Sequence, residues 1–211
     1  MEGEKLQAAA LVLAGGDSKR FGYPKAFLNF NGKLIIDHII ESLSRCFADI
    51  IVVTHLPERL QHLEVKTTKD LIDIPSKSSL RGLHAGLSVS DFTYNFVIAC
   101  DMPFVNLDFI KYMYFAKDGH DVVVPEIDGY LQPLYAFYKR NCVDIIEENL
   151  YSGRFKITEF FKKVKVRYID TEEINRFDPE QKMFFNINTS EDYQQAQQIL
   201  NEYSPRTKKS E

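Results

Sequence analysis

Positive charge gathers in one glycine-containing loop near the start of the chain. Gly15 and Gly16 follow a short apolar run. Three cations come after them, Lys19, Arg20 and Lys25, all within seven residues of sequence. Adjacent glycines let backbone N–H groups approach an anion closely and tolerate positive φ. The loop therefore predicts a site for a phosphate-bearing ligand such as a triphosphate, with an ordinary solvated turn as the alternative. The spacing fits neither GxxxxGK[ST] nor GxGxxG.

A carboxylate follows a second apolar run. Asp101 comes directly after the stretch Phe96–Cys100, and Pro103 then turns the chain. Magnesium prefers hard oxygen ligands and is usually held by one or two carboxylates together with substrate oxygens. Asp101 is thus a candidate ligand for Mg²⁺ beside phosphates, although an aspartate here is equally suited to capping a loop.

Two further motifs have weaker patterns. Gly82 and Gly86 frame the start of an expected helix, where a backbone N–H group can meet a base or a phosphate, or where the glycines simply allow a turn and close packing. Asn186 and Asn188 alternate with Ile187, which places both amides on one face of an extended segment. They are candidate neutral ligands for a metal or phosphate, and also ordinary capping residues.

These residues need a scaffold, and the hydrophobic pattern predicts one. Ala8–Leu13 and Ile50–Thr54 are apolar strand-like runs, and helical spacing predicts a helix over Leu34–Phe47 between them, which makes a βαβ crossover. The alternation continues to the C-terminus. Further helices are expected at Leu80–Val89, Leu107–Ala116, Val143–Leu150 and Ile157–Phe161, and further strands at Phe96–Cys100, Asp121–Pro125, Leu134–Tyr138 and Val164–Ile169. A last helix is expected to run to about Glu202 from a cap at Thr189, with Asp192 completing a capping-box-like pair.

Such alternation predicts an α/β protein with a three-layer α/β/α Rossmann-like fold and a mostly parallel central sheet. We expect one domain over residues 1–203 and a flexible charged tail over 204–211. Open parallel sheets bind ligands at the carboxyl ends of their strands, where Gly15 and Asp101 would both lie.

Composition narrows the class of protein further. The chain has 211 residues and a formal net charge of 26 − 30 = −4, so it lacks the basic surface of a nucleic-acid binder. We expect no membrane span, because no run approaches ~18 apolar residues, and no signal peptide. Three cysteines without a CxxC pair are typical of reduced thiols and predict a cytoplasmic protein.

The first loop resembles the signature LAGG-x-S-x-R-[FM]-G-x-x-K of nucleotidyltransferases that activate sugars, isoprenoid precursors or the molybdenum cofactor. With G-x-x-AGL from Gly82, CDMPF from Cys100, QPL-[YF]-A from Gln132 and NINTSED from Asn186, the chain resembles the molybdenum cofactor guanylyltransferase family from Leu13 to about Ala196. Related cytidylyltransferases tend to have LAAG, DQP and an aspartate in the last motif. The glycine at 15, the methionine at 102 and the asparagine at 186 therefore favour guanine.

The chain departs from the family pattern in two places. Leu83-His84 stands where the family usually has Pro-Leu, and Val53-Thr54 stands where an asparagine often touches the nucleotide.

The resemblance implies an enzyme that transfers GMP from GTP to the terminal phosphate of molybdenum-molybdopterin and releases pyrophosphate. It implies phosphate contacts from Lys25 and Arg20, Mg²⁺ held by Asp101, and transient contacts with other cofactor-biosynthesis or molybdoenzyme-maturation proteins. The expected substrate-binding residues are Leu13, Ala14, Gly15, Gly16, Ser18, Lys25, Asp70, Gly82, Asp101, Gln132, Asn186 and Asn188. Among them Asn186 and Asn188 would face the metal and pterin, and Gln132 the second substrate.

Three alternatives stay open at this point. A cytidylyltransferase acting on molybdopterin would share the fold, and competition between GTP and CTP would separate the two enzymes. A sugar-1-phosphate nucleotidyltransferase usually has an additional sugar-binding domain, for which the chain has little room. A non-catalytic nucleotide-binding module would not need both Lys25 and Asp101, because binding alone requires no metal carboxylate.

Overall fold

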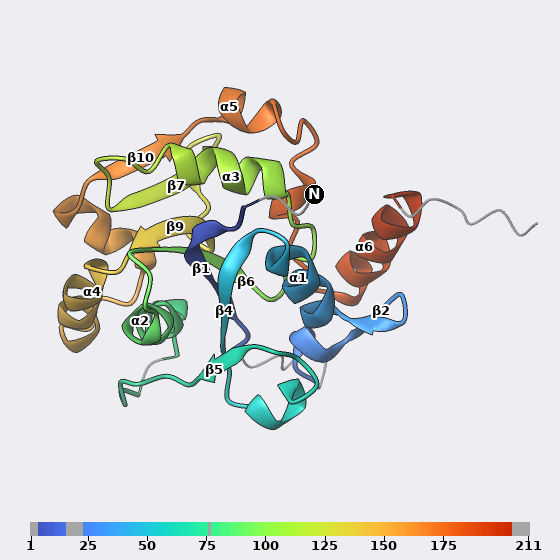
Figure 1. Ribbon diagram of the computed structural model, residues 1–211, viewed down its shortest axis with the longest axis horizontal. Helices are drawn as coiled ribbons and strands as arrows, with labels where there is room; N and C mark the ends of the chain where they lie inside the picture. Colours follow the sequence, from blue (N-terminus) through green and yellow to red (C-terminus); the bar gives the residue numbers. More distant parts are fainter. Residues whose placement is uncertain (1–3, 16–22, 76, 204–211) are drawn as a thin grey trace, which may run out of the picture.

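A twisted, mostly parallel sheet forms the centre of the computed structural model, which describes residues 4–15, 23–75 and 77–203 (Figure 1). The strand order is β10-β7-β9-β6-β1-β4-β5, with β8 paired to β7 beside this path. The strands are β1 (Leu6–Leu13), β4 (Phe47–Val53), β5 (Lys66–Thr68), β6 (Tyr94–Ala99), β7 (Val122–Ile127), β8 (Tyr130–Leu131), β9 (Tyr135–Lys139) and β10 (Val166–Ile169). The pairs β1–β4, β1–β6, β4–β5 and β7–β10 are parallel, whereas β9 runs antiparallel to both β6 and β7.

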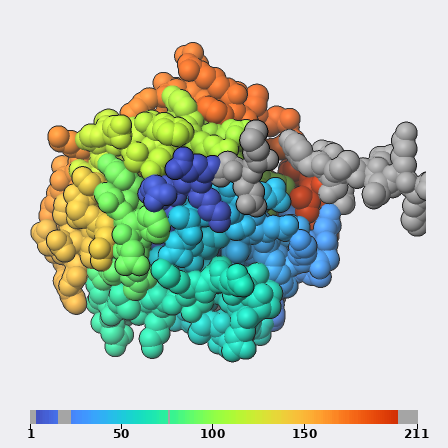
Figure 2. All heavy atoms as spheres, in the orientation of Figure 1, coloured from blue at the N-terminus to red at the C-terminus, as the bar shows by residue number. Residues whose placement is uncertain are grey.

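Helices cover both faces of this sheet. In Figure 1, α2 and α4 lie together on one side, and α1, α3 and α5 lie on the other. Figure 2 shows the same face in atoms, with β5 and its neighbours in teal below, α3 in lime above and α4 in yellow at the left. The helices are α1 (Ile35–Ser44), α2 (Ser79–Val89), α3 (Leu107–Phe115), α4 (Cys142–Tyr151), α5 (Thr171–Asn175) and α6 (Ser190–Tyr203). The three-layer arrangement expected from the sequence is confirmed.

The central strand β1 explains why the two layers form. Every residue of Ala8–Leu13 is buried, and successive side chains of a strand point to opposite faces. Ala8, Ala10 and Val12 pack into the core shared with α1 and α3, whereas Ala9, Leu11 and Leu13 pack into the core shared with α2 and α4. A run that is apolar on both faces is what a strand covered by helices on both sides requires.

The predicted helix over Leu34–Phe47 is shorter than expected. Helix α1 ends at Ser44, and Phe47 is already the first residue of β4, where it pairs with Leu6. Its ring stacks on Phe96 with the centroids 5.7 Å apart, so Phe47 is buried through the sheet rather than through the helix. Its spacing from Leu43 matched a helical period by coincidence.

Several short elements were not predicted. The hairpin of β2 (Asn29–Phe30) and β3 (Lys33–Leu34) turns through Asn31 and Gly32, whose φ angles are 52° and 86°. An Asn-Gly pair with positive φ at both residues is the usual two-residue hairpin turn, so this signal was available in the sequence. The short 3-10 helices η1 (Lys25–Phe27), η2 (Pro57–Leu60) and η4 (Lys182–Phe184), together with β5, β8 and α5, were also missed. The predicted helix at Ile157–Phe161 is the 3-10 helix η3 (Ile157–Lys163).

The last helix begins as predicted. The backbone N–H of Asp192 donates to Thr189 Oγ1 at 3.1 Å, and the N–H of Thr189 donates back to Asp192 Oδ2 at 2.8 Å. This reciprocal capping box fixes the start of α6 and, with it, the preceding asparagine segment. Within the described residues, the helices are too short or too polar to cross a membrane.

Candidate functional site

A cavity of about 800 Å³ opens at the carboxyl ends of β1, β4 and β6, beside the start of α2. Thr68, Val53, Leu13 and Ala99, the last residues of β5, β4, β1 and β6, are in register with one another across the sheet. The residues that follow these four positions therefore emerge side by side, as expected for a parallel sheet. The glycine loop and the motif of Asp101 meet here because they follow the neighbouring strands β1 and β6.

The first part of the glycine loop lines this cavity. The N–H of Ala14 donates to the carbonyl of Val53 at 2.9 Å, and the N–H of Cys100 donates to the carbonyl of Leu13 at 3.1 Å. Gly15 is exposed, and a Cβ added there would meet none of the described residues within 4 Å, so among those residues the space beside this backbone is open. Gly16, Ser18 and Arg20 lie outside the described residues.

Lys25 joins three segments that are far apart in the sequence. From η1, its Nζ donates to Asn188 Oδ1 at 2.8 Å and to Asp101 Oδ2 at 3.2 Å. The N–H of Ile187 donates to the carbonyl of Asp101 at 2.9 Å, which ties the last motif to the loop after β6. Both charged side chains are largely buried, with exposed fractions of 17% for Lys25 and 22% for Asp101. The structure thus brings Lys25, Asp101 and Asn188 together.

The paired asparagines do not have the same role. Ile187 is buried while Asn186 and Asn188 are exposed, which confirms that both amides lie on one face of the segment. Only Asn188 of the pair reaches Lys25. The Asn186 amide donates to the carbonyl of Phe184 at 2.9 Å.

Gln132 lies in the turn between β8 and β9. Its N–H donates to the carbonyl of Pro125 at 2.9 Å, and its carbonyl accepts from Tyr135. Its neighbour Leu134 lines the cavity, while Gln132 itself is not part of the lining.

A second charged group lies at the other end of the cavity. Asp70 Oδ2 is 3.3 Å from Arg81 Nη2 and 3.6 Å from His55 Nε2. All three residues line the cavity. Asp70 was predicted from the family resemblance, whereas Arg81 and His55 were not predicted. An arginine before a helix glycine and a histidine after a strand have no distinctive sequence pattern, and only the fold places them beside Asp70.

The two glycines of α2 differ in what surrounds them. Gly82 lines the cavity, and a Cβ there would come no closer than 3.5 Å to Leu13. At Gly86 a Cβ would lie 2.9 Å from Cδ1 of Leu11, so this glycine lets α2 approach β1. The first glycine therefore shapes the cavity and the second permits close helix packing.

The position where the family often has an asparagine is occupied by buried Thr54. Its N–H donates to the carbonyl of Thr68 at 2.8 Å, and its hydroxyl accepts from the N–H of Leu56 at 3.1 Å. Thr54 thus stabilises the turn after β4, and it is one of the residues that line the cavity.

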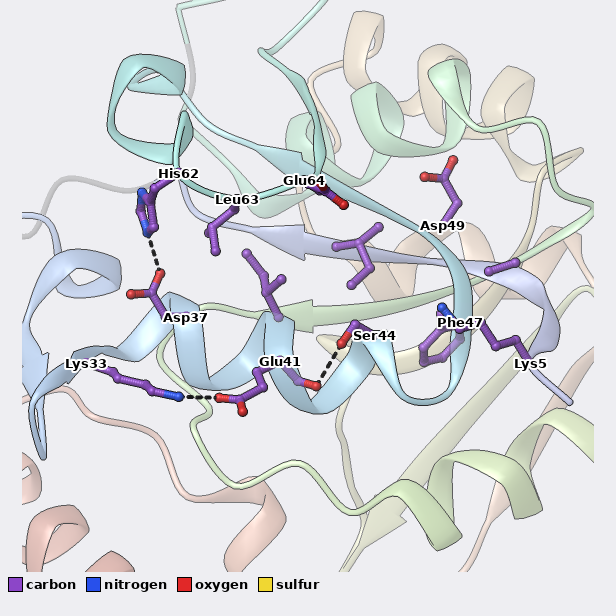
Figure 3. A pocket seen from close by; sticks show the side chains of 13 residues that line it. Lys5, Lys33, Asp37, Glu41, Ser44, Phe47, Asp49, His62, Leu63 and Glu64 are labelled. Carbon is purple, nitrogen blue, oxygen red and sulfur yellow. Dashed lines mark hydrogen bonds and ion pairs between the residues drawn. The ribbon is translucent and has the colours of Figure 1, made fainter. Parts of the chain in front are cut away.

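A second hollow lies on the α1 side of the molecule, near the beginning of β4 (Figure 3). Its charged side chains are arranged in pairs: Asp37 with His62 at 3.0 Å, and Lys33 with Glu41 at 2.8 Å. None of the motif residues that the structure describes lines it. The cavity at the carboxyl ends of the strands is therefore the candidate site.

Comparison with known proteins agrees with this geometry. The family model of the MobA-like NTP transferase domain matches residues 10–166. A probable molybdenum cofactor guanylyltransferase from Peptoclostridium acidaminophilum is 37% identical over 99% of this chain and 96% of its own length. The chain belongs to the molybdenum cofactor guanylyltransferase family. A second probable family member, from Natranaerobius thermophilus, is 37% identical over 91% of this chain and 96% of its own length.

The fold of this family agrees as well. The crystal structure of molybdopterin-guanine dinucleotide biosynthesis protein A from Archaeoglobus fulgidus superposes with a TM-score of 0.80 at 30% identity, covering 92% of this chain and 99% of that one. The family resemblance predicted from the motifs is confirmed. The chain is a nucleotidyltransferase, with the nucleotidyltransferase type of Rossmann-like fold.

Proposed function

We propose that this chain transfers GMP from GTP to the terminal phosphate of molybdenum-molybdopterin, giving the molybdopterin guanine dinucleotide cofactor and pyrophosphate. The observation that carries the proposal is the meeting of Lys25, Asp101 and Asn188 beside the loop after β1. This is a cation, a carboxylate and a neutral amide at the place where the fold presents phosphates. The names of its relatives support the same reaction.

The physical difficulty of this reaction is charge. The attacking group is already an anionic phosphate at neutral pH, so the reaction needs no strong general base. It needs two polyanions to be brought together in line. The Lys25 ammonium would neutralise phosphate oxygens, and its bond to Asn188 fixes its position without adding a further charge. Arg20, in the same loop, would add a second cation.

The donor atoms here are suited to Mg²⁺. Asp101 offers a carboxylate and Asn188 an amide oxygen, both hard ligands, and neither sulfur nor imidazole takes part in this cluster. Magnesium is usually bound by one or two carboxylates and completes its coordination with phosphate oxygens and water. We propose that Asp101 holds Mg²⁺, which would supply further neutralisation of phosphate charge when bound.

The remaining substrate contacts that we propose lie partly in the cavity and partly outside its described lining. Leu13, Ala14, Gly15 and Gly82 would contact the nucleotide, with the backbone of the loop after β1 closest to the phosphates. Gly16 and Ser18 would extend the same loop. Asn186 and Gln132 would face the pterin substrate. We also propose transient contacts with proteins that deliver this substrate or receive the product.

Pyrophosphate release tests the proposal. Purified protein, molybdenum-molybdopterin and Mg²⁺ should release pyrophosphate with GTP, and excess CTP should compete poorly. Release with CTP but not with GTP would reassign the chain to the cytidylyltransferases. Tight GTP binding without release of pyrophosphate would indicate a non-catalytic module.

A further inference from the structure

An arginine outside the cavity lies against the segment that carries Lys25. Arg59 belongs to the 3-10 helix η2, which follows β4. Its guanidinium lies over the ring of Tyr23, 4.7 Å from the centroid, and over the ring of Phe27, 5.3 Å from the centroid. Its Nη1 also donates a hydrogen bond to the Tyr23 hydroxyl. Because Tyr23 and Phe27 stand two residues before and two residues after Lys25, one side chain contacts this segment on both sides of the lysine.

The two rings differ in how the rest of the protein holds them. Phe27 is 4% exposed and belongs to the core shared with α1 and α3. Tyr23 is 40% exposed, and within the described residues its recorded side-chain contacts are those with Arg59. The core therefore fixes the segment after Lys25, whereas Arg59 holds the segment before it.

The residue between Tyr23 and Lys25 makes this restraint effective. Pro24 has φ of −61° and ψ of 125°, its ring prevents rotation about φ, and a proline also restricts the residue that precedes it to extended conformations. The N–H of Phe27 donates to the carbonyl of Pro24 at 3.0 Å, which closes the turn of η1. A Tyr23 ring that is held in place therefore limits the positions open to the Lys25 backbone, and with them the reach of Nζ.

The backbone around Arg59 is fixed as well. Its N–H donates to the carbonyl of Leu56 at 3.1 Å, and the next residue, Leu60, is 2% exposed and packs in the same core as Phe27. A guanidinium is planar and more weakly hydrated than an ammonium, so it stacks well on aromatic rings. Arg59 thus connects the segment after β4 to the end of the loop after β1.

We propose that Arg59 is a positioning residue for Lys25. It holds the two rings that flank this lysine, so that the ammonium stays beside Asp101 and Asn188, where it would meet phosphate oxygens. Arg59 is not among the residues that line the cavity, so it acts through Lys25 rather than by touching the substrate. The inference rests on the role proposed above for Lys25 in the transfer of GMP.

The position of the Lys25 ammonium can be measured without turnover. An N-hydroxysuccinimide ester of acetate, used at low concentration, acylates each lysine at a rate that depends on how freely its amine reaches the solvent, and mass spectrometry measures the rate at each position. Arg59→Ala should raise the acylation rate of Lys25 about three- to ten-fold, because cation–π contacts at exposed sites have modest free energies. Arg59→Lys keeps a cation near the rings and should recover part of the protection.

The matched control for this measurement is Arg45→Ala. Arg45 is 66% exposed on α1, where it lies 3.9 Å from Glu41, away from the site. Its removal takes away the same charge as Arg59→Ala and should leave the acylation rate of Lys25 unchanged.

Turnover tests whether Arg59 acts through Lys25. In the pyrophosphate assay, Arg59→Ala should lower kcat/KM for GTP by about three- to ten-fold, and Tyr23→Ala should have a similar effect. In the Lys25→Ala background, Arg59→Ala should cause no further loss, since no ammonium is left to position. A residue that only stabilised the fold, or one that touched the substrate directly, would lower activity in both backgrounds.

Thermal unfolding of each variant identifies any that fail to fold, and Tyr23→Ala replaces Arg59→Ala in both measurements if the latter unfolds. The inference is overturned if folded Arg59→Ala acylates Lys25 at the rate of Arg45→Ala, or if it loses the same factor of activity with and without Lys25. Failure of the proposed function looks different, because the unaltered protein would then release no pyrophosphate. In that case the acylation rates would still decide whether Arg59 positions Lys25.

Discussion

A single ammonium group, on Lys25, joins the loop after β1 to the two segments that carry Asp101 and Asn188. We predict that Lys25→Ala leaves a folded protein whose rate of pyrophosphate release falls by ~10²–10³, because one preorganised contact to developing charge is lost. Lys33→Ala is a suitable control, since Lys33 is 54% exposed and pairs with Glu41 away from the site. Activity near that of Lys33→Ala would remove Lys25 from the mechanism.

Asp101 is the carboxylate that we propose as the ligand of Mg²⁺, and it also pairs with Lys25. We predict that Asp101→Asn unfolds at nearly the same temperature but needs a much higher Mg²⁺ concentration for half-maximal turnover, because an amide oxygen is a weaker ligand for a hard cation. A titration of activity against Mg²⁺ measures this. An unchanged Mg²⁺ requirement would assign the metal to other groups and leave Asp101 only its ion pair with Lys25.

The two glycines of helix α2 allow packing and binding to be tested separately. Gly86→Ala should lower the free energy of unfolding by about 1–3 kcal/mol, because the new Cβ would lie 2.9 Å from Leu11 and push α2 away from β1. Gly82→Ala makes only an ordinary contact at 3.5 Å and should keep or raise stability by up to about 1 kcal/mol, since alanine favours helices. It should nevertheless weaken GTP binding by narrowing the cavity.

Urea unfolding and calorimetry distinguish the two variants. Equal losses of stability at both positions would contradict the different packing of the two glycines. Normal GTP affinity in Gly82→Ala would show that this side of the cavity does not touch the nucleotide.

The elements that could be predicted from the sequence are those whose side chains repeat with a clear period. The continuous apolar run at Ala8–Leu13 located the first strand, because a strand buried on both faces is apolar at every position. The isoleucines of α1 located the first helix, because a helix buried on one face is apolar at helical spacing. The antiparallel direction of β9 had no such signal, since strand direction depends on its partners β6 and β7. Phe47 was misplaced because a single apolar residue fits a helix and a strand equally well.

The residues of the candidate site also fall into those that the sequence predicted and those that it did not. Lys25, Asp101 and Asn188 were expected from motifs. The shared edge of a parallel sheet explains why the loops after β1 and β6 meet, whereas the hydrogen bond from Ile187 to Asp101, which brings Asn188 beside them, had no sequence signal. Arg81 and His55 were missed because their importance comes from contact with Asp70, which depends on the packing of β5 and α2. The spacing of residues within one segment does not reveal which residues of another segment it will contact.

Across the whole molecule, net charge has little bearing on the site. A formal net charge of −4 does not favour binding of polyanions over the surface as a whole. At one end of the cavity, however, Lys25 offsets Asp101, and at the other end Arg81 offsets Asp70. Both carboxylates are thus compensated within a few ångströms. The distribution of charge over the cavity, rather than its sum over the chain, suits an anionic substrate.

The fold also holds protonated thiols and phenols in its interior, which links stability to pH. Burial, with Asp121 nearby, raises the pKa of the Cys142 thiol to about 12, and burial raises the pKa of Cys46, Tyr135 and Tyr138 as well. An unfolded cysteine loses its proton near pH 8.5. Between about pH 8.5 and 12 the unfolded chain therefore releases protons that the folded chain keeps, so stability is complete below this range and falls as pH rises through it.

We predict that the free energy of unfolding, measured with urea in reducing buffer, falls steadily from pH 8 to pH 10. Cys142 alone contributes a slope approaching about 1.4 kcal/mol per pH unit above pH 9. Cys142→Ala removes that proton and should lose stability less steeply with pH, although its cavity lowers stability at every pH. The comparison rests on the two slopes, so the cavity does not affect it. Parallel slopes for the two proteins would show that Cys142 titrates alike in the folded and unfolded chain.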